Sequence, residues 1–265
     1  MKLKFMVLFL IIFGLYPAVS AAGESCFEQP VIIEHHGVYS EQLDDILKFD
    51  VYIPPCLDRR IVGGYPVVYL LHGQDMDLSI WEQARLDDVI RETLTRSDIP
   101  PFYTVLPQED RFLLSPAISE FDEAVMEALI PWVDAHYNTC TLRSCRDIAG
   151  ISRGALWAEK IAFEHPDMFE AAGLLSMPGQ AFEDQALYYL VLNQTPDQRL
   201  RIRIDAGNED DYRHEAARAS SQLSYLGYLY EYNITPGGHD ADYWHRMLGE
   251  YFVWFSEAWT ELSRP

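Results

Sequence analysis

The stretch A-G-I-S-R-G-A-L-W-A, residues 149–158, decides how the rest of this chain is interpreted. It places Ser152 between two glycines, after a short apolar run and before a segment of helical composition. Residues 150–154 fit the pattern G-x-S-x-G, in which a serine occupies a strained turn between a strand and a helix. Serine and glycine are common, so the value of this pattern depends on what surrounds it.

The surrounding sequence alternates short apolar runs with longer segments of helical period, which predicts a mainly parallel sheet with helices on both faces. We expect strands within residues 49–54, 65–73, 102–107, 147–151, 170–176, 200–207 and 228–234. The fold class is therefore α/β, and Ser152 directly follows one of its central strands.

Four segments should form the main helices. Residues 81–95 and 119–137 have helical period, and Pro131 should kink the second of them. Residues 155–164 should form a helix that ends before Pro166, because proline disfavours helical geometry in the residue that precedes it. The last helix carries a stripe that should pack against the sheet: Trp244, Leu248, Tyr251, Phe255, Trp259 and Leu262.

Composition and charge exclude several classes of protein. The chain has 265 residues, of which 49 % are hydrophobic and 23 % charged, as in an ordinary globular protein with a sizeable core. Its formal net charge is −21. Such a surface repels nucleic acid and anionic membranes, so we expect neither as a partner.

The first residues have the layout of a secretory signal peptide, with two lysines, an apolar run and then small residues. We expect residues 1–22 to be removed, with cleavage after Ser20 or Ala22, and residues 23–265 to form one domain. The apolar run is shorter than a bilayer span requires, so we expect no stable membrane insertion. The residues before Cys26 do not fit a lipoprotein signal. The mature protein should be secreted or periplasmic.

Export makes disulfide bonds possible among the four cysteines of the chain. The closeness of Cys140 and Cys145 favours pairing them, which leaves Cys26 to pair with Cys56. His136 precedes the second pair, but the spacing matches no common zinc pattern, and we expect no metal site.

A serine nucleophile needs a histidine as base and a carboxylate that orients the histidine, and in this kind of fold they follow in the order serine, acid, histidine. The acid should lie in the loop after the strand at 200–207. Asp205 falls inside the strand and should be structural. Asp210 lies beyond the strand end and is favoured, with Glu209 and Asp211 as alternatives.

Three histidines follow this loop. His214 and His245 lie in helical segments, where surface or packing roles are expected. His239 lies in T-P-G-G-H-D, between the last strand and the last helix, which is where the general base should be.

Two backbone N–H groups should face the oxyanion that forms when an ester is attacked. We expect them from Arg153 and from Gln74, with His72 bracing the loop that holds Gln74. Trp81 and Trp244 flank these loops, so either ring could stack on an aromatic acyl group or a sugar, or both could belong to the core.

Taken together, several motifs resemble one known family over residues 49–259. The matching segments are V-Y-I-P-P-C, Y-P-V-V-Y-L-L-H-G-Q with a following Trp81, L-I-P-W-V-D, G-I-S-R-G-A, H-P-D-M-F, D-A-G-N-E-D and P-G-G-H-D. The chain resembles the putative esterases of the esterase-D type, which include feruloyl esterases and S-formylglutathione hydrolases. The resemblance implies an α/β-hydrolase fold with Ser152, Asp210 and His239 as catalytic triad.

The chain departs from the common G-x-S-M-G-G form of that family at Arg153 and Ala155. The Arg153 side chain could bind an acidic group of a substrate or form a surface ion pair.

The sequence therefore favours a secreted serine esterase that acts on a small-molecule or carbohydrate-linked ester and needs no metal or organic cofactor. An acyltransferase on the same fold and a non-catalytic binding protein that retains the fold are the alternatives.

Overall fold

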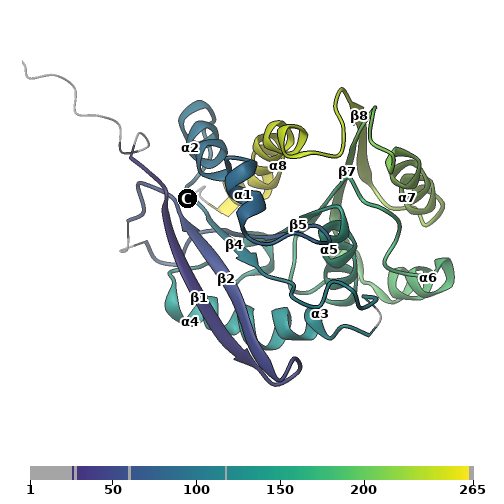
Figure 1. The fold of residues 1–265 in the computed structure, drawn as a ribbon, viewed down its shortest axis with the longest axis horizontal. Coiled ribbons are helices and arrows are strands. Elements are labelled where there is room, and N and C mark those ends of the chain that lie inside the picture. The colour runs from purple at the N-terminus through teal and green to yellow at the C-terminus, as the bar shows by residue number, and fades with distance from the viewer. Residues whose placement is uncertain (1–25, 27–28, 59–60, 117, 263–265) are drawn as a thin grey trace, which may run out of the picture.

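The computed structural model describes residues 26, 29–58, 61–116 and 118–262, and the predicted signal peptide lies outside this part of the chain. A central sheet of eight strands runs through the molecule in the order β1-β2-β4-β3-β5-β6-β7-β8 (Figure 1). The strands are β1 Ile32–Ser40, β2 Asp45–Ile53, β3 Val67–Leu71, β4 Tyr103–Pro107, β5 Arg146–Ile151, β6 Ala171–Leu175, β7 Arg201–Gly207 and β8 Tyr230–Thr235. The six strands from β4 to β8 in this order are parallel to their neighbours. Strand β2 is antiparallel to β4, and β1 is antiparallel to β2.

The mainly parallel sheet predicted from the sequence is confirmed, and each of the seven expected strands is present. β1 was not predicted. It is an edge strand that pairs with β2 alone, and most of its residues are exposed. It therefore lacks the buried apolar run by which the central strands can be recognised.

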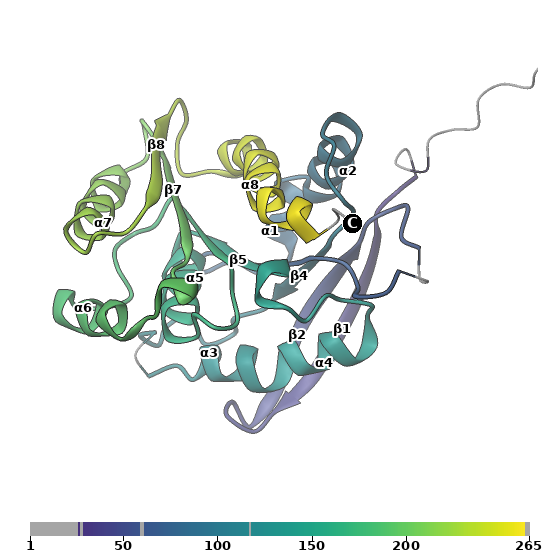
Figure 2. The same cartoon turned by 180° about the vertical axis from the view of Figure 1, so that it is seen from behind.

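Helices cover both faces of the sheet (Figure 2). The helices are α1 Ser79–Gln83, α2 Leu86–Arg96, α3 Phe121–Ala124, α4 Ile130–His136, α5 Arg153–Glu164, α6 Asp184–Asn193, α7 Arg213–Tyr225 and α8 Ala241–Leu262. The buried side chains of α1, α2 and α8 form one core cluster with one face of the sheet. Those of α3, α4, α5, α6 and α7 form the other.

Two expected helices are interrupted. The one predicted over residues 81–95 is divided at Arg85, whose backbone has a φ of 49°, into α1 and α2. The one predicted over 119–137 contains a π-helical turn, Val125–Leu129, between α3 and α4. This turn lies directly before Pro131, where an ordinary α-helical ladder would lose a hydrogen bond and meet the proline ring.

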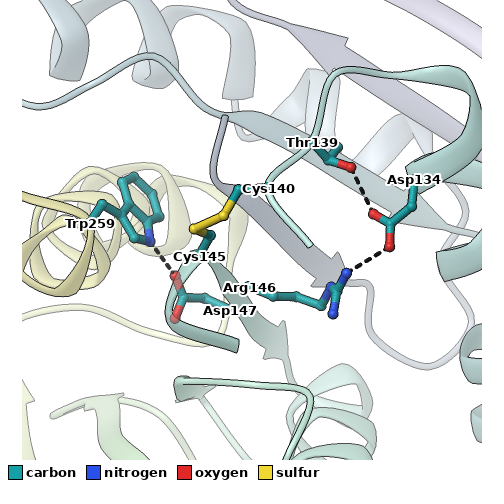
Figure 3. The surroundings of a disulfide bond; sticks show 7 residues. All are labelled: Asp134, Thr139, Cys140, Cys145, Arg146, Asp147 and Trp259. Carbon is teal, nitrogen blue, oxygen red and sulfur yellow. Dashed lines mark hydrogen bonds and ion pairs between the residues drawn. A yellow bond between two sulfur atoms is a disulfide. The ribbon is translucent and has the colours of Figure 1, made fainter. Parts of the chain in front are cut away.

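The structure pairs the cysteines as the sequence predicts. Cys26 lies 1.95 Å from Cys56, and Cys140 lies 2.01 Å from Cys145, measured between sulfur atoms. The second pair precedes β5, whose first residue, Arg146, binds Asp134 in α4 (Figure 3). Among the described residues no helix is long and apolar enough to span a bilayer.

Candidate active site

Ser152 occupies the turn between β5 and α5 with φ 53° and ψ −123°, a backbone conformation that residues other than glycine rarely adopt. Two hydrogen bonds hold this turn. The Ser152 N–H donates to the Leu175 carbonyl of β6, and the Ser152 carbonyl accepts from the Ala155 N–H, each at 2.9 Å. Ser152 is 8 % exposed. The G-x-S-x-G pattern thus forms the strained strand-to-helix turn that it predicts.

The two glycines of the pattern allow the backbone to pass this closely. A Cβ added at Gly150 would lie 2.0 Å from the carbonyl oxygen of Gly154. A Cβ added at Gly154 would lie 2.1 Å from the carbonyl oxygen of Leu71, at the end of β3. Both distances are far below any contact that a carbon atom tolerates, so the geometry requires glycine at both positions.

The loop after β7 places Asp210 beside His239. Asp210 is fully buried, its Oδ2 accepts a hydrogen bond from His239 Nδ1 at 3.0 Å, and its Oδ1 accepts from the Tyr212 N–H at 2.8 Å. Burial alone would raise the pKa of Asp210, but these hydrogen bonds outweigh burial and leave the pKa below its ordinary value. The group is therefore a charged acceptor that orients the imidazole ring.

The other acids of this region lie elsewhere. Glu209 and Asp211, the two alternatives left open by the sequence, are exposed. Asp205 is buried within β7 and pairs with Arg203, whose Nε lies 2.8 Å from Asp205 Oδ2. The position of Asp205 inside the strand thus gives it the structural contact expected of it.

The loop that carries His239 is tied to the loop that carries Asp210. Gly237 donates its N–H to the Asn208 side chain at 3.1 Å, and its carbonyl accepts from the Glu209 N–H at 2.9 Å. Asp240, the next residue after His239, accepts the Tyr243 N–H at the start of α8. The two loops therefore hold the histidine and its carboxylate as one unit.

Neither of the other two candidate histidines reaches this unit in the described structure. His214 is exposed on α7. His245, on α8, directs its Nδ1 at the Ala84 carbonyl, 2.8 Å away, and its Nε2 at Arg85. His245 thus links α8 to the segment between α1 and α2.

Trp244 contacts His239 directly and is linked to Asp210 through Ser176. Its ring meets that of His239 edge-on, with 5.3 Å between ring centroids. Its Nε1–H donates to Ser176 Oγ at 3.2 Å, and the Ser176 hydroxyl in turn is hydrogen-bonded to Asp210. Sequence reasoning missed Ser176. Its position at the end of the β6 segment, between Ser152 and Asp210 in strand order, is the signal that could have found it.

The suggestion that Trp81 or Trp244 stacks on a substrate is not supported. Trp81 is 0 % exposed and Trp244 1 % exposed, and both belong to the core between the sheet and helices α1, α2 and α8. Both residues are flanked by aliphatic and aromatic neighbours of the core, so the alternative core role describes them. The flanking position in sequence did not reveal that their rings turn inward.

The loop after β3 passes beside Ser152. A Cβ at Gly73 would lie 3.2 Å from the Ser152 Cβ, so the backbone from His72 to Gln74 borders the serine turn. His72 is buried and bonds to the Gly73 carbonyl through Nδ1 and to the Glu109 N–H through Nε2, each at 2.8 Å. The expected bracing by His72 is therefore present.

Arg153 directs its side chain inward. Its guanidinium is paired with the buried carboxylate of Glu109, with 2.6 Å between Nη2 and Oε1, and the two side chains are 8 % and 2 % exposed. The expectation that Arg153 binds an acidic substrate group or forms a surface ion pair is wrong on both counts. The Arg153 guanidinium is already paired with the buried carboxylate of Glu109.

The sheet order, the serine turn at the carboxyl end of β5, and the histidine and carboxylate that follow β8 and β7 define an α/β hydrolase. The sequence profile of the family described as "Putative esterase" matches residues 40–255, and the chain belongs to this family. The resemblance inferred from the motifs is confirmed.

A curated relative is similar over part of the chain. An endo-1,4-beta-xylanase/feruloyl esterase of Xylanibacter ruminicola is 27 % identical over 166 residues, which is 57 % of this chain and 23 % of that protein. The chain therefore matches less than a quarter of that relative's length.

Solved structures of esterases share the fold. A ferulic acid esterase superposes with a TM-score of 0.75 at 19 % identity and covers 86 % of this chain and 99 % of its own. An S-formylglutathione hydrolase from Staphylococcus aureus gives 0.69 at 18 %, covering 85 % and 98 %. A ferulic acid esterase from Anaeromyces mucronatus, solved with ferulic acid, gives 0.70 at 17 %, covering 86 % and 90 %.

Proposed function

We propose that this protein is a serine esterase that hydrolyses carboxylic esters through an acyl-enzyme on Ser152, with His239 as general base and Asp210 as the orienting acid. The observation that carries the proposal is the hydrogen bond between His239 Nδ1 and the buried Asp210, at the same edge of the sheet as the strained turn of Ser152. Membership in an esterase family supports the reaction class.

The mechanism follows from the hydrogen-bond pattern. Asp210 accepts the Nδ1–H of His239, so Nε2 is free to take the Ser152 hydroxyl proton as Oγ attacks the ester carbonyl. The N–H groups of Arg153 and Gln74 stabilise the oxyanion. The carbon–oxygen bond to the alcohol then breaks, and His239 returns the proton to the alcohol.

Water completes the cycle. His239 takes a proton from a water molecule, which attacks the acyl-enzyme, and the carboxylic acid leaves as Ser152 regains its proton. Every proton passes through His239, which exchanges protons with Ser152, the leaving alcohol and the attacking water, so the proposed mechanism uses no cofactor.

The names of the relatives suggest the acid component. A feruloyl esterase among the relatives and ferulic acid esterases among the structures lead us to propose esters of hydroxycinnamic acids, free or linked to carbohydrate, as substrates. The two disulfide pairs support an extracytoplasmic location, where such bonds persist, and we propose residues 23–265 as the single catalytic domain.

The test is a burst assay with p-nitrophenyl acetate, p-nitrophenyl butyrate and a methyl hydroxycinnamate. Ser152→Ala should abolish turnover and labelling by a fluorophosphonate. Asp210→Asn should lower kcat by about 10³- to 10⁴-fold, because the Tyr212 N–H holds the amide oxygen, so the amide NH2 faces His239 Nδ1 and selects the wrong tautomer of the imidazole. Asp211→Asn, at the exposed neighbour, is the matched control and should change kcat by less than about twofold. Serine-independent turnover, or none in the folded wild type, would refute the proposal.

A further inference from the structure

Arg153 and Glu109 form a buried, two-point ion pair directly beside the serine turn. Arg153 Nε lies 2.8 Å from Glu109 Oε2 and Nη2 lies 2.6 Å from Oε1, so two side-by-side N–H···O bonds join the guanidinium to the carboxylate. Nη2 also donates to the Leu114 carbonyl at 2.5 Å, and the Trp157 ring lies 5.6 Å from the guanidinium carbon. Several independent contacts therefore fix one orientation of the Arg153 side chain.

Glu109 passes this constraint to the loop after β3 through its backbone. The Glu109 N–H donates to His72 Nε2, so Nε2 carries no proton, and Nδ1–H must be the donor to the Gly73 carbonyl. Burial lowers the pKa of His72, which keeps the ring neutral and preserves this tautomer. The Gly73 carbonyl is thus held at the end of a chain of contacts that starts at Arg153.

The Gly73 carbonyl and the Gln74 N–H belong to the same peptide group. A trans peptide is planar, and its C=O and N–H point in opposite directions. When His72 holds the carbonyl of this peptide, it also sets the direction of the Gln74 N–H. That N–H is one of the two groups assigned to the oxyanion.

The other assigned group is the N–H of Arg153 itself. Its peptide is held in the same way, because the Ser152 carbonyl accepts the Ala155 N–H at 2.9 Å. Arg153 therefore supplies one oxyanion donor, its own backbone N–H. Its side chain also binds Glu109, whose N–H holds His72, and His72 holds the peptide group of the other donor, Gln74.

We propose that the pair Arg153–Glu109 is a positioning pair that sets the distance and angle between the two oxyanion donors. The inference rests on the proposed esterase function and names how its oxyanion site is held. A buried ion pair is weak evidence for stability, since burial of both charges costs about as much as their attraction returns. Its defined geometry, in contrast, suits a role in positioning.

The test compares kcat, KM and the melting temperature of Arg153→Met, Glu109→Gln, the double variant and Arg153→Lys, with active sites titrated by a fluorophosphonate. Methionine is an unbranched side chain with the helix propensity of arginine, but it is shorter and uncharged. We expect kcat to fall about 10- to 100-fold in both single variants with KM within about threefold, because a donor displaced by about 1 Å stabilises the oxyanion poorly. The rate of fluorophosphonate labelling should fall in parallel.

The double variant should be no slower than the slower single variant, because the two residues act as one unit. Arg153→Lys should recover part of the lost kcat, since it restores the charge but not the two-point geometry. If Arg153→Met does not fold, Glu109→Gln and Arg153→Lys decide the question by the same measurements.

The matched control is Arg146→Met. Arg146 begins β5 and Ser152 follows its last residue, so Arg146 lies at the opposite end of that strand. It pairs with Asp134 at 2.7 Å (Figure 3). It should lower the melting temperature and leave kcat per titrated site within about twofold of wild type.

Wild-type kcat per titrated site in both Arg153→Met and Glu109→Gln, with only a lower melting temperature, would show a merely structural pair and overturn the inference. Its failure differs from failure of the proposed function, in which the wild type itself shows no turnover that depends on Ser152.

Discussion

Replacing Gly154 with alanine should displace the serine turn from the loop after β3. The added Cβ would lie 2.1 Å from the carbonyl oxygen and 2.5 Å from the carbonyl carbon of Leu71, and 2.7 Å from the carbonyl oxygen of His72. All three are backbone atoms at the end of β3, which is paired on both sides, so no flexible side chain can give way. An ordinary contact of about 3.5 Å requires the start of α5 to move by about 1.4 Å relative to the end of β3.

The expected magnitude follows from that displacement. Overpacking of this kind costs about 1–3 kcal/mol of the free energy of unfolding, and a shift of about 1 Å between nucleophile and oxyanion donors costs about 100-fold in kcat. The matched control is Gly179→Ala, where an added Cβ meets nothing within 4 Å and the backbone φ is not positive. That change should leave kcat unchanged and stabilise the fold by up to about 1 kcal/mol.

Urea unfolding supplies the free energies, and kcat per fluorophosphonate-titrated site supplies the activity. If Gly154→Ala unfolds at the wild-type midpoint with wild-type kcat, the close approach of α5 to β3 is not what positions Ser152. An equal loss in Gly179→Ala would likewise refute the steric reasoning, because that position has space for the methyl group.

Three further changes have defined outcomes. Trp244→Phe should lower kcat about 3- to 10-fold at unchanged KM, since it retains a ring beside His239 but loses the donor to the serine that supports the acid; steady-state kinetics would show no change if that contact is idle. Burial raises the pKa of Glu159 to about 7, so the folded protein keeps a proton that the unfolded chain releases above about pH 4.5. The free energy of unfolding therefore falls as the pH rises from about 4.5 to about 7. Glu159→Gln should remove this loss, and its stability relative to wild type should rise by about 3 kcal/mol between about pH 4 and pH 8 in urea unfolding; a constant difference would contradict the assigned titration. Replacing Cys26 and Cys56 with alanine opens a bridge that spans 30 residues and should cost about 3.5 kcal/mol in urea unfolding while kcat stays unchanged, because the bridge lies at the opposite end of the sheet from the serine turn; lost activity per folded molecule would contradict this.

The central strands could be predicted because each is a short apolar run that is buried on both faces. All five residues of β3, β4 and β6 are buried, and their sequences contain almost no polar interruption. The edge strand β1 offers no such signal, since most of its residues are exposed and the face it turns to the core carries only His36, Val38 and Ser40, which do not form an apolar run. Helix α5 begins two residues before the predicted start, because Arg153, next to the strained Ser152, already has helical geometry.

The hydrophobic period of the sequence did not predict the two interruptions of helices, at Arg85 and at Val125–Leu129. The break at Arg85 separates two segments whose apolar residues pack into the same core cluster, so periodicity alone predicts one continuous helix. The π-helical turn before Pro131 is a local accommodation of a residue without an N–H. The sequence predicted a kink at Pro131; what the structure has before this residue is a π-helical turn.

The residues of the candidate site could be named because each follows a recognisable strand, and the carboxyl ends of parallel strands meet at one edge of a sheet. Side-chain direction was not available in the same way. Trp81 and Trp244 flank the site loops in sequence, yet their rings turn into the core, and Arg153 turns toward Glu109 rather than solvent. Such directions depend on neighbours that are distant in sequence.

The sequence by itself determined the α/β class, favoured the cysteine pairing that the structure has, and placed a candidate serine, a group of acids and a candidate histidine in three successive loops, because hydrophobic period, spacing and turn chemistry are local properties of a chain. Only the tertiary structure decided which acid meets the histidine and where the arginine beside the serine points. Those contacts join loops separated by 29 and 44 residues, and they exist because packing of the sheet brings the loops together.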